Sequence, residues 1–271
     1  MRLPPRLGLS WLLLAVLAWS PAAAAEPSAG FSSDEVALTL VADEPGADGS
    51  IRAALSIDLA PGWKTYWIDP GDAGIPPSVD LSGSSNVVVE SLSFPPPHRF
   101  GDEYASSNGY SGPMAIALRL RQDPAAEATV LRAKIFIGVC RDLCIPVAAE
   151  LTALPGRGGA AVIAAAFGAL PGRGNAAHGI DGAALSADGK VLTVSATAPG
   201  SDVADLFVAG PKGWSFGAPT STQGNGGSLA FTLPVLSRPR HAGPTPPPLD
   251  IVMTSRAGAV EALSVIPRAL P

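Results

Sequence analysis

One stretch organises this chain: Ile135–Val147, with the sequence IFIGVCRDLCIPV, which contains both cysteines of the protein. Its two flanks are apolar and rich in β-branched residues, a composition typical of β-strands. The three residues between the cysteines have the length of a hairpin loop. Residues on either side of such a loop lie about 5 Å apart, within the Cα separation that a disulfide accepts. The sequence therefore predicts that Cys140 and Cys144 can form a disulfide across a tight turn.

This cysteine pair has three possible roles: a redox-active disulfide, an inert structural disulfide, or a metal site. A disulfide that closes so short a loop stabilises the fold by about 2 kcal/mol, against about 4.7 kcal/mol for a hundred-residue loop. A small ring in a short turn is also more easily strained and reduced. Two thiolates suit a soft metal such as copper(I), but beyond the initiator only Met114 and Met253 offer further soft ligands. The redox role is favoured, and the other two stay open.

Residues 1–25 have the pattern of a secretory signal peptide. Arg2 and Arg6 supply the basic start, residues 7–19 form an apolar run, and Ala23–Ala25 offers small residues for cleavage. Cleavage would leave 246 of the 271 residues, and the loss of two arginines would change the formal charge from −5 to −7. The apolar run is too short for a membrane span, so we expect none after cleavage. We expect the chain to be exported to an oxidising compartment, in which a cysteine pair becomes a disulfide unless something reduces it.

Composition favours β structure over helix. The chain has 30 glycines and 28 prolines between short apolar runs, and long helical patterns are scarce. An acidic chain with few lysines argues against nucleic acid or an anionic membrane as a partner. No phosphate-binding loop or zinc ligand set is visible in the sequence, so we expect no cofactor and assign no metal ligands.

Alternating apolar residues predict strands in the first half, at residues 35–41, 51–59, 63–67, 87–92, 116–120 and 129–136. We interpret Asp69 and Asp72, which lie beside proline and glycine, as turn formers rather than as an acid–base pair. Asp102–Tyr104 is placed in a polar loop that ends at residues 108–110. In the second half, residues 160–170 predict one helix, which Pro171 ends. Strands then resume, at 191–196, 206–208, 228–233, 249–253 and 260–265.

Four motifs in this order carry a resemblance to a known family. They are Gly62–Trp67 (GWKTYW), Pro70–Pro77 (PGDAGIPP), Asp102–Tyr104 (DEY) and Cys140–Pro146 (CRDLCIP). Together they resemble the N-terminal periplasmic domain of DsbD-type thiol–disulfide interchange proteins, in the ScsB-like branch, over about residues 30–155. The resemblance implies an immunoglobulin-like β-sandwich with the cysteine pair in a small added β subdomain.

The fold prediction is therefore an all-β chain of two immunoglobulin-like β-sandwich domains joined by a short helical linker. We expect the thiol–disulfide exchange domain at residues 30–155 and the helical linker at 156–180. The second, smaller β-sandwich is expected at 181–271.

The resemblance also implies a function, that of a thiol–disulfide oxidoreductase (protein-disulfide reductase). Such a domain takes electrons from a membrane-embedded thiol reductase and passes them to periplasmic thiol–disulfide proteins. The resemblance assigns the attack on the partner's disulfide to Cys144, and the role of the resolving thiol to Cys140. Asp102, Glu103 and Tyr104 match a loop that caps the cysteines, although the best-known members have phenylalanine there and a longer spacer between the cysteines. The chain carries neither the transmembrane module nor the thioredoxin-like domain of DsbD, so electrons are expected from a separate protein.

The neighbours of the cysteines are expected to modulate them. Arg141 favours a thiolate beside it and Asp142 disfavours one, and the sequence leaves open which effect is larger. Cys140 follows an apolar run and is expected to be more buried. Cys144 precedes Ile145–Pro146, where proline limits strand pairing, and is expected to be more accessible.

Overall fold

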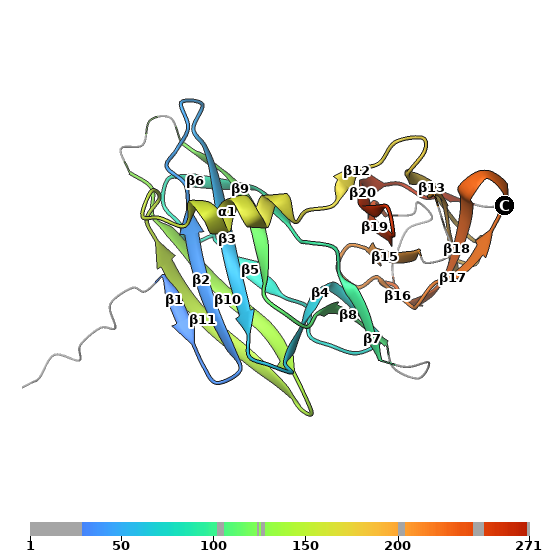
Figure 1. The fold of residues 1–271 in the computed structure, drawn as a ribbon, viewed down its shortest axis with the longest axis horizontal. Helices are drawn as coiled ribbons and strands as arrows, with labels where there is room; N and C mark the ends of the chain where they lie inside the picture. Colours follow the sequence, from blue (N-terminus) through green and yellow to red (C-terminus); the bar gives the residue numbers. More distant parts are fainter. Residues whose placement is uncertain are drawn as a thin grey trace, which may run out of the picture.

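The computed structural model describes residues 29–101, 106–123, 125, 128–199, 204–240 and 247–269. The expected signal peptide, residues 1–25, and the expected cap residues, Asp102–Tyr104, lie outside these ranges. The described chain forms two β-sandwiches joined through one short helix (Figure 1). The prediction of an all-β chain with two immunoglobulin-like sandwiches is thus confirmed.

The first sandwich has two sheets. The first sheet has the order β1 (Gly30–Ser32), β2 (Val36–Ala42), β3 (Ser50–Leu59), β9 (Met114–Gln122), β6 (Val87–Ser93). The second sheet has the order β11 (Cys144–Ala153), β10 (Leu131–Cys140), β4 (Lys64–Gly71), β8 (Ser106–Tyr110), β7 (His98–Gly101), and β5 (Ser78–Asp80) also pairs with β10. The strands β4, β8 and β7 extend from the second sheet toward the second sandwich (Figure 1).

The second sandwich also has two sheets. One has the order β12 (Gly172–Arg173), β20 (Gly258–Val265), β19 (Leu249–Ser255), β15 (Asp205–Ala209). The other has the order β16 (Ser215–Phe216), β18 (Ser228–Ser237), β14 (Val191–Thr197), β13 (Gly179–Leu185), β21 (Arg268–Ala269). In addition β17 (Thr220–Gln223) pairs with β18, and a 3-10 helix at Asn225–Gly227 connects the two.

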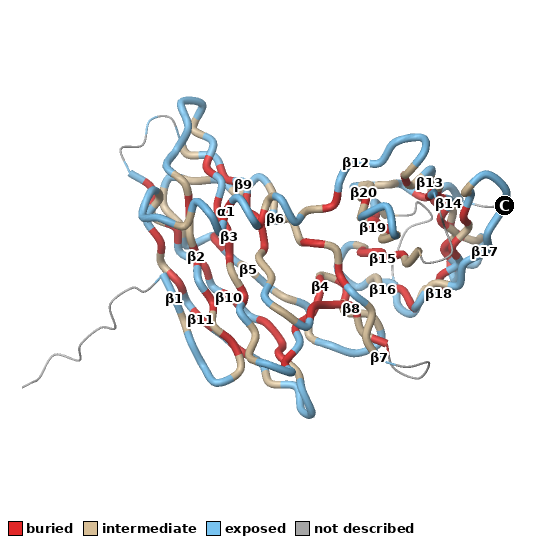
Figure 2. Tube along the Cα trace, viewed as in Figure 1, coloured by how far each residue is buried: buried red, intermediate tan, exposed pale blue. Residues whose placement is uncertain are grey.

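Each sandwich has its own hydrophobic core between its sheets (Figure 2). In β2 every second residue from Val36 to Ala42 is buried, so Leu38 and Leu40 face the opposite sheet. The strand period of two produces this alternation, because successive side chains point to opposite faces. Burial of each such leucine side chain contributes about 1.5–3 kcal/mol to the free energy of unfolding. The alternation that identified these strands in the sequence therefore also builds the core.

Residues 106–110 correct one sequence-based expectation. We placed residues 108–110 at the end of a polar loop, but the structure has the strand β8 there, with Asn108 and Tyr110 buried. This strand pairs with β4, where Tyr66 lies opposite Gly109. A side chain at Gly109 would collide with the backbone of Thr65, so the glycine allows β4 and β8 to approach closely. Polar residues form a strand here because the neighbouring strand β4 provides hydrogen-bond partners for their backbone N–H and C=O groups.

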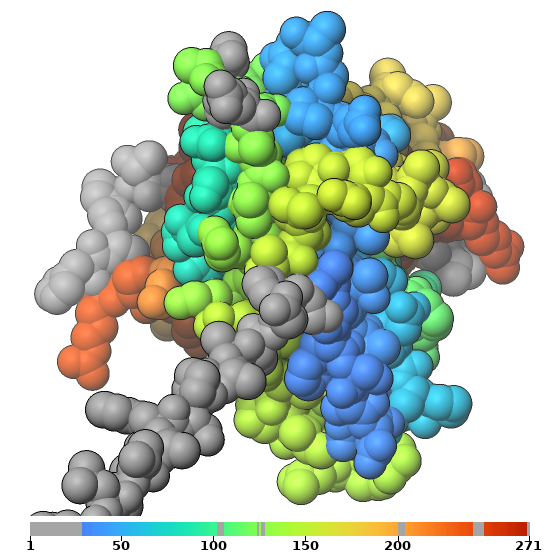
Figure 3. Space-filling view, turned by 90° about the vertical axis from the view of Figure 1, so that its left-hand side faces the viewer, coloured from blue at the N-terminus to red at the C-terminus, as the bar shows by residue number. Residues whose placement is uncertain are grey.

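The helix α1 (Ala160–Gly168) packs on the first sandwich. Its alanines favour helix formation, and Ile163 and Ala166 on one side are buried against Ala54 of β3 and Ala117 of β9. Figure 3 shows this helix lying across the surface of the first sandwich. The expected linker helix is therefore also a cover for the outer face of a sheet.

Candidate redox site at Cys140 and Cys144

The two cysteines end the strands of one hairpin. Cys140 is the last residue of β10 and Cys144 the first of β11, and the register of the two strands places them opposite each other. They form a disulfide with a Cα–Cα distance of 4.1 Å. The predicted hairpin and its disulfide are both present. The hairpin is local, so its pairing follows from the strand pattern and the loop length.

The two cysteines differ in exposure. Cys144 and the three loop residues before it are exposed, and Leu143 has 73% of its surface accessible. Cys140 is half-buried. β11 lies at the edge of its sheet, and an edge strand is where a proline such as Pro146 is tolerated. Cys144 is thus the more exposed residue of the pair, as the sequence led us to expect.

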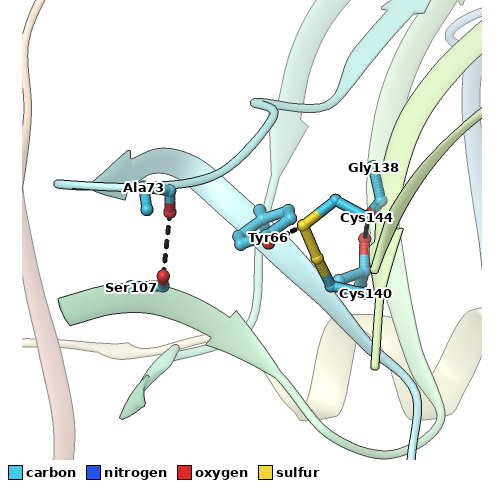
Figure 4. The surroundings of a disulfide bond; sticks show 7 residues. Tyr66, Ala73, Ser107, Gly138, Cys140 and Cys144 are labelled. Carbon is cyan, nitrogen blue, oxygen red and sulfur yellow. Dashed lines mark hydrogen bonds between the residues drawn. A yellow bond between two sulfur atoms is a disulfide. The ribbon is translucent and has the colours of Figure 1, made fainter. Parts of the chain in front are cut away.

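Tyr66 contacts the disulfide directly. Its hydroxyl lies 3.2 Å from the Sγ of Cys144 (Figure 4). A sulfur in a disulfide carries no hydrogen, so the Tyr66 O–H is the donor. Burial raises the pKa of Tyr66 above its usual value of 10, which keeps the phenol protonated near neutral pH. Tyr66 was not among the predicted site residues, although it belongs to the Gly62–Trp67 motif.

The loop after β4 holds the Tyr66 ring in place. Gly74 packs so closely on this ring that a Cβ there would lie 2.5 Å from two of the ring carbons. Ser107 donates a hydrogen bond of 2.8 Å to the carbonyl of Ala73, which ties the loop to β8 (Figure 4). The glycine and proline spacing of the Pro70–Pro77 motif therefore has a structural role beside the disulfide.

Thr65 and Lys64 join β4 to the cysteine hairpin. The Thr65 hydroxyl is buried and donates to the carbonyl of Gly138 at 2.9 Å. Lys64 lies opposite Cys140 in the strand register, and its Nζ is 4.7 Å from the ring centre of Phe100 in β7. Lys64 is thus a second neighbour of the pair that sequence reasoning missed.

Arg141 and Asp142 lie close to each other at the hairpin tip. The Nε of Arg141 is 3.3 Å from an Asp142 carboxylate oxygen, and both side chains are mostly exposed. The Arg141 guanidinium also lies 5.1 Å from the ring centre of Trp63. Because the opposite charges are adjacent and solvated, their effects on a nearby thiol largely offset each other.

Asp69 and Asp72 do not form the acid–base pair considered above. Asp69 is buried, and its carboxylate accepts a hydrogen bond of 3.0 Å from the backbone N–H of Gly71. Burial raises the pKa of Asp69 to about 6. Asp72 instead accepts from the hydroxyl of Ser106 at 3.1 Å. Asp69 supports the last residues of β4 and Asp72 the segment that follows them, as turn-forming residues do.

A metal site would need a cluster of side chains that could hold a metal ion. The described residues contain no group of three or more histidine, cysteine, aspartate or glutamate side chains placed to hold a metal ion. Met253 is buried in the core of the second sandwich, and Met114 packs against the core of the first. The two methionines that offered soft ligands are thus used in packing.

Within the part of the chain that the structure describes, no helix is long and apolar enough to cross a membrane.

Fold and site together define a class of protein: tandem β-sandwiches with a surface disulfide at the tip of one hairpin. Residues 32–156 match the family "Thiol:disulfide interchange protein DsbD, N-terminal", and residues 169–268 match a domain of unknown function, DUF8393. The first sandwich is thus a DsbD-type N-terminal domain, which associates the chain with thiol–disulfide interchange.

A solved structure supports the same two-domain arrangement. The N-terminal periplasmic domain of ScsB from Proteus mirabilis is similar over 89% of this chain and 98% of its own, with 20% identity and a TM-score of 0.69. This likeness shows the fold. A conserved domain protein from Bacillus anthracis matches at 10% identity and a TM-score of 0.21, over 84% of this chain and 76% of its own, which is too distant for any argument. No curated protein is significantly similar to the chain in sequence.

Proposed function

We propose that this protein is a periplasmic protein-disulfide reductase module that relays electrons through Cys140 and Cys144. The donor is a membrane-embedded thiol reductase, and the acceptors are periplasmic thiol–disulfide proteins. The observation that carries the proposal is the disulfide at the exposed end of a hairpin in a DsbD-type domain. The signal-peptide pattern of residues 1–25 and the periplasmic location of the ScsB domain support export.

The chemistry is two successive thiol–disulfide exchanges. In the reduced protein the Cys144 thiolate attacks one sulfur of the acceptor's disulfide, and the other acceptor sulfur leaves as a thiolate that takes up a proton. The Cys140 thiolate then attacks the Sγ of Cys144, which re-forms the Cys140–Cys144 disulfide and releases the second acceptor thiol. Two electrons and two protons pass to the acceptor, and a dithiol of the membrane partner reduces the pair again by the reverse steps.

The exposure difference supports this division of labour. Cys144 is exposed at the start of an edge strand, so an incoming disulfide can approach it. Cys140 is half-buried at the end of β10. A mixed disulfide at Cys144 also leaves Cys140 directly opposite it across the hairpin, in position to resolve the intermediate.

Trapping of the mixed disulfide tests the assignment. Cys140→Ser removes the resolving thiol and should accumulate adducts of Cys144 with periplasmic proteins, whereas Cys144→Ser should accumulate few. The measurement is non-reducing electrophoresis of both variants recovered from the source cell, with mass spectrometry of the adducts. If Cys144→Ser is the variant that accumulates adducts, the two roles are reversed.

A redox titration separates exchange from the two alternatives. An exchange pair should convert reversibly between dithiol and disulfide across a series of glutathione buffers, as followed by alkylation of the free thiols. An inert disulfide stays oxidised throughout the series. A copper site would protect the reduced thiols only when copper(I) is added. Adducts absent from both variants, together with a wild-type pair that resists reduction, would exclude the proposed function.

A further inference from the structure

The second sandwich contacts the strands β4, β7 and β8, the first of which carries Tyr66. A cluster of five buried residues spans the two sandwiches; we call it the interdomain cluster, and it comprises Trp67, Tyr110, Phe207, Ala209 and Val252. Trp67 of β4 and Phe207 of β15 are each 2% exposed. Their ring centres are 6.1 Å apart with planes at 73°, an edge-on arrangement that aromatic pairs favour. The two sandwiches are therefore packed together at β4.

Arg99 makes the polar part of the same interface. This residue of β7 places Nη2 3.0 Å and Nε 3.2 Å from the two carboxylate oxygens of Asp205, and Nη2 is also 2.9 Å from the carbonyl of Leu206. Its guanidinium lies 4.8 Å from the ring centre of Phe207. A bidentate arginine–carboxylate pair fixes orientation as well as contributing energy. Arg99 thus holds β7 against the start of β15.

Asn108 and Asp69 extend these contacts to β8 and β4. Arg99 Nη1 donates to the amide oxygen of Asn108 at 2.9 Å, and Asn108 donates to the carbonyl of Asp69 at 3.1 Å. The backbone N–H of Phe216 in the second sandwich also lies close enough to the Asp69 carboxylate to lower its pKa. All three strands of the extension, β4, β7 and β8, are therefore connected to the second sandwich.

The same strand, β4, carries the residue that contacts the disulfide. Tyr66 and Trp67 are consecutive, so their side chains leave opposite faces of β4. Tyr66 reaches Cys144 on one side, and Trp67 reaches Phe207 on the other. Figure 1 shows β4 and β8 on the side of the first sandwich that faces the second sandwich. A shift of the second sandwich would therefore move the hydroxyl that lies beside the Cys144 sulfur.

We infer that the second sandwich acts as a support that holds Tyr66 against Cys144, with Phe207 and Asp205 as positioning residues for the redox site. This inference deepens the proposed function, on which it rests, by giving the second domain a role in the reactivity of the pair. Loss of Phe207 or Asp205 loosens β4, withdraws Tyr66 from the sulfur and leaves the disulfide more open to attack.

The experiment compares matched substitutions in the full-length chain. Phe207→Leu and Phe231→Leu make the same change at two fully buried phenylalanines of the second sandwich, but Phe231 lies in that sandwich's own core. Asp205→Asn breaks the interdomain ion pair, and Asp43→Asn breaks the Arg52–Asp43 pair of the first sandwich as its control. One readout is the rate at which dithiothreitol reduces the native disulfide. The other is amide hydrogen exchange in β4 and β8.

The expected result is specific to the interdomain residues. Phe207→Leu and Asp205→Asn should speed reduction about fivefold and speed amide exchange in β4 and β8, since both depend on local opening. In Phe231→Leu and Asp43→Asn, the rate of disulfide reduction and the rate of amide exchange in β4 and β8 should both stay within about twofold of wild type. Asp205→Glu, which keeps the carboxylate, should restore most of the wild-type rate.

Two results separate failure of this inference from failure of the proposed function. If the wild-type pair is reducible but Phe207→Leu and Asp205→Asn reduce no faster than their controls, the support role is wrong and the exchange function stands. If the native wild-type pair resists reduction altogether, the exchange function is wrong. Amide exchange then decides whether the second sandwich holds β4: selective faster exchange in β4 and β8 supports it, and unchanged exchange overturns it.

Discussion

Replacement of Tyr66 by phenylalanine removes one hydroxyl from the site and leaves the ring in place. In the oxidised protein this hydroxyl lies 3.2 Å from the Sγ of Cys144. After reduction the same O–H faces a thiolate, and donation to the charged form lowers a thiol pKa. A hydrogen bond to a charged group is worth about 1.5–3 kcal/mol. Because Cys144 is exposed, we take the lower end, about 1.5 kcal/mol, which corresponds to about one pKa unit.

The expected result for Tyr66→Phe is a pKa of the Cys144 thiol that is about one unit higher than in the Tyr66 protein. At neutral pH the thiolate fraction would fall up to about tenfold, and the greater nucleophilicity of the more basic thiolate would return part of this loss, leaving a rate about threefold lower. The assay is the pH dependence of alkylation by iodoacetamide in a Cys140→Ser background, where Cys144 is the reacting thiol.

Tyr110→Phe is the matched control. The Tyr110 hydroxyl is buried and donates to the carbonyl of Pro95 at 2.8 Å, so its loss should affect stability and leave the alkylation profile unchanged. An unshifted profile in Tyr66→Phe would show that the hydroxyl does not stabilise the thiolate. Equal shifts in both variants would show that the effect arises from general loosening rather than from the Tyr66 contact.

Three further predictions concern the cap, the buried carboxyl and the helix. Tyr104→Ala should speed alkylation of the reduced pair, and an unchanged rate would mean that Tyr104 does not shield the cysteines. Because the pKa of Asp69 is about 6 when folded and near 3.8 when unfolded, this group stabilises the fold fully below pH 4 and loses up to about 3 kcal/mol of that contribution as pH rises through 6. Urea unfolding should show a lower free energy of unfolding at pH 7 than at pH 4.5 in wild type, and a smaller difference between the two pH values in Asp69→Asn. Equal differences in the two proteins would contradict the prediction. A chain truncated at Leu154 should fold and keep its redox activity, but the loss of α1 uncovers Ala54 and Ala117. Thermal unfolding should show it to be less stable than one ending at Leu170, by the roughly 1.5–3 kcal/mol that burial of Ile163 contributes, and equal melting temperatures would show that the helix adds nothing.

Features that depend on neighbouring residues could be predicted from the sequence. The hairpin of Cys140 and Cys144 follows from two β-branched flanks and a three-residue loop. The alternation in β2 specifies both the strand and its buried face, because side chains on a strand alternate with a period of two. The alanine-rich run of α1 and the motifs of the DsbD-type domain are likewise local patterns. For this reason the fold class and the cysteine pair could be predicted from residues close together in the chain.

The surroundings of the pair depend on contacts between distant residues. Tyr66 reaches Cys144 across 78 positions, and Arg99 reaches Asp205 across 106. Neither contact has a sequence signal, because it is set by the register of β4 against β10 and β8 and by the packing of two separate cores. The same reason explains why residues 108–110 were mistaken for the end of a loop: the strand β8 forms there because β4 lies beside it. A local pattern determines what a segment can become, and only the tertiary structure decides which other side chains lie beside it.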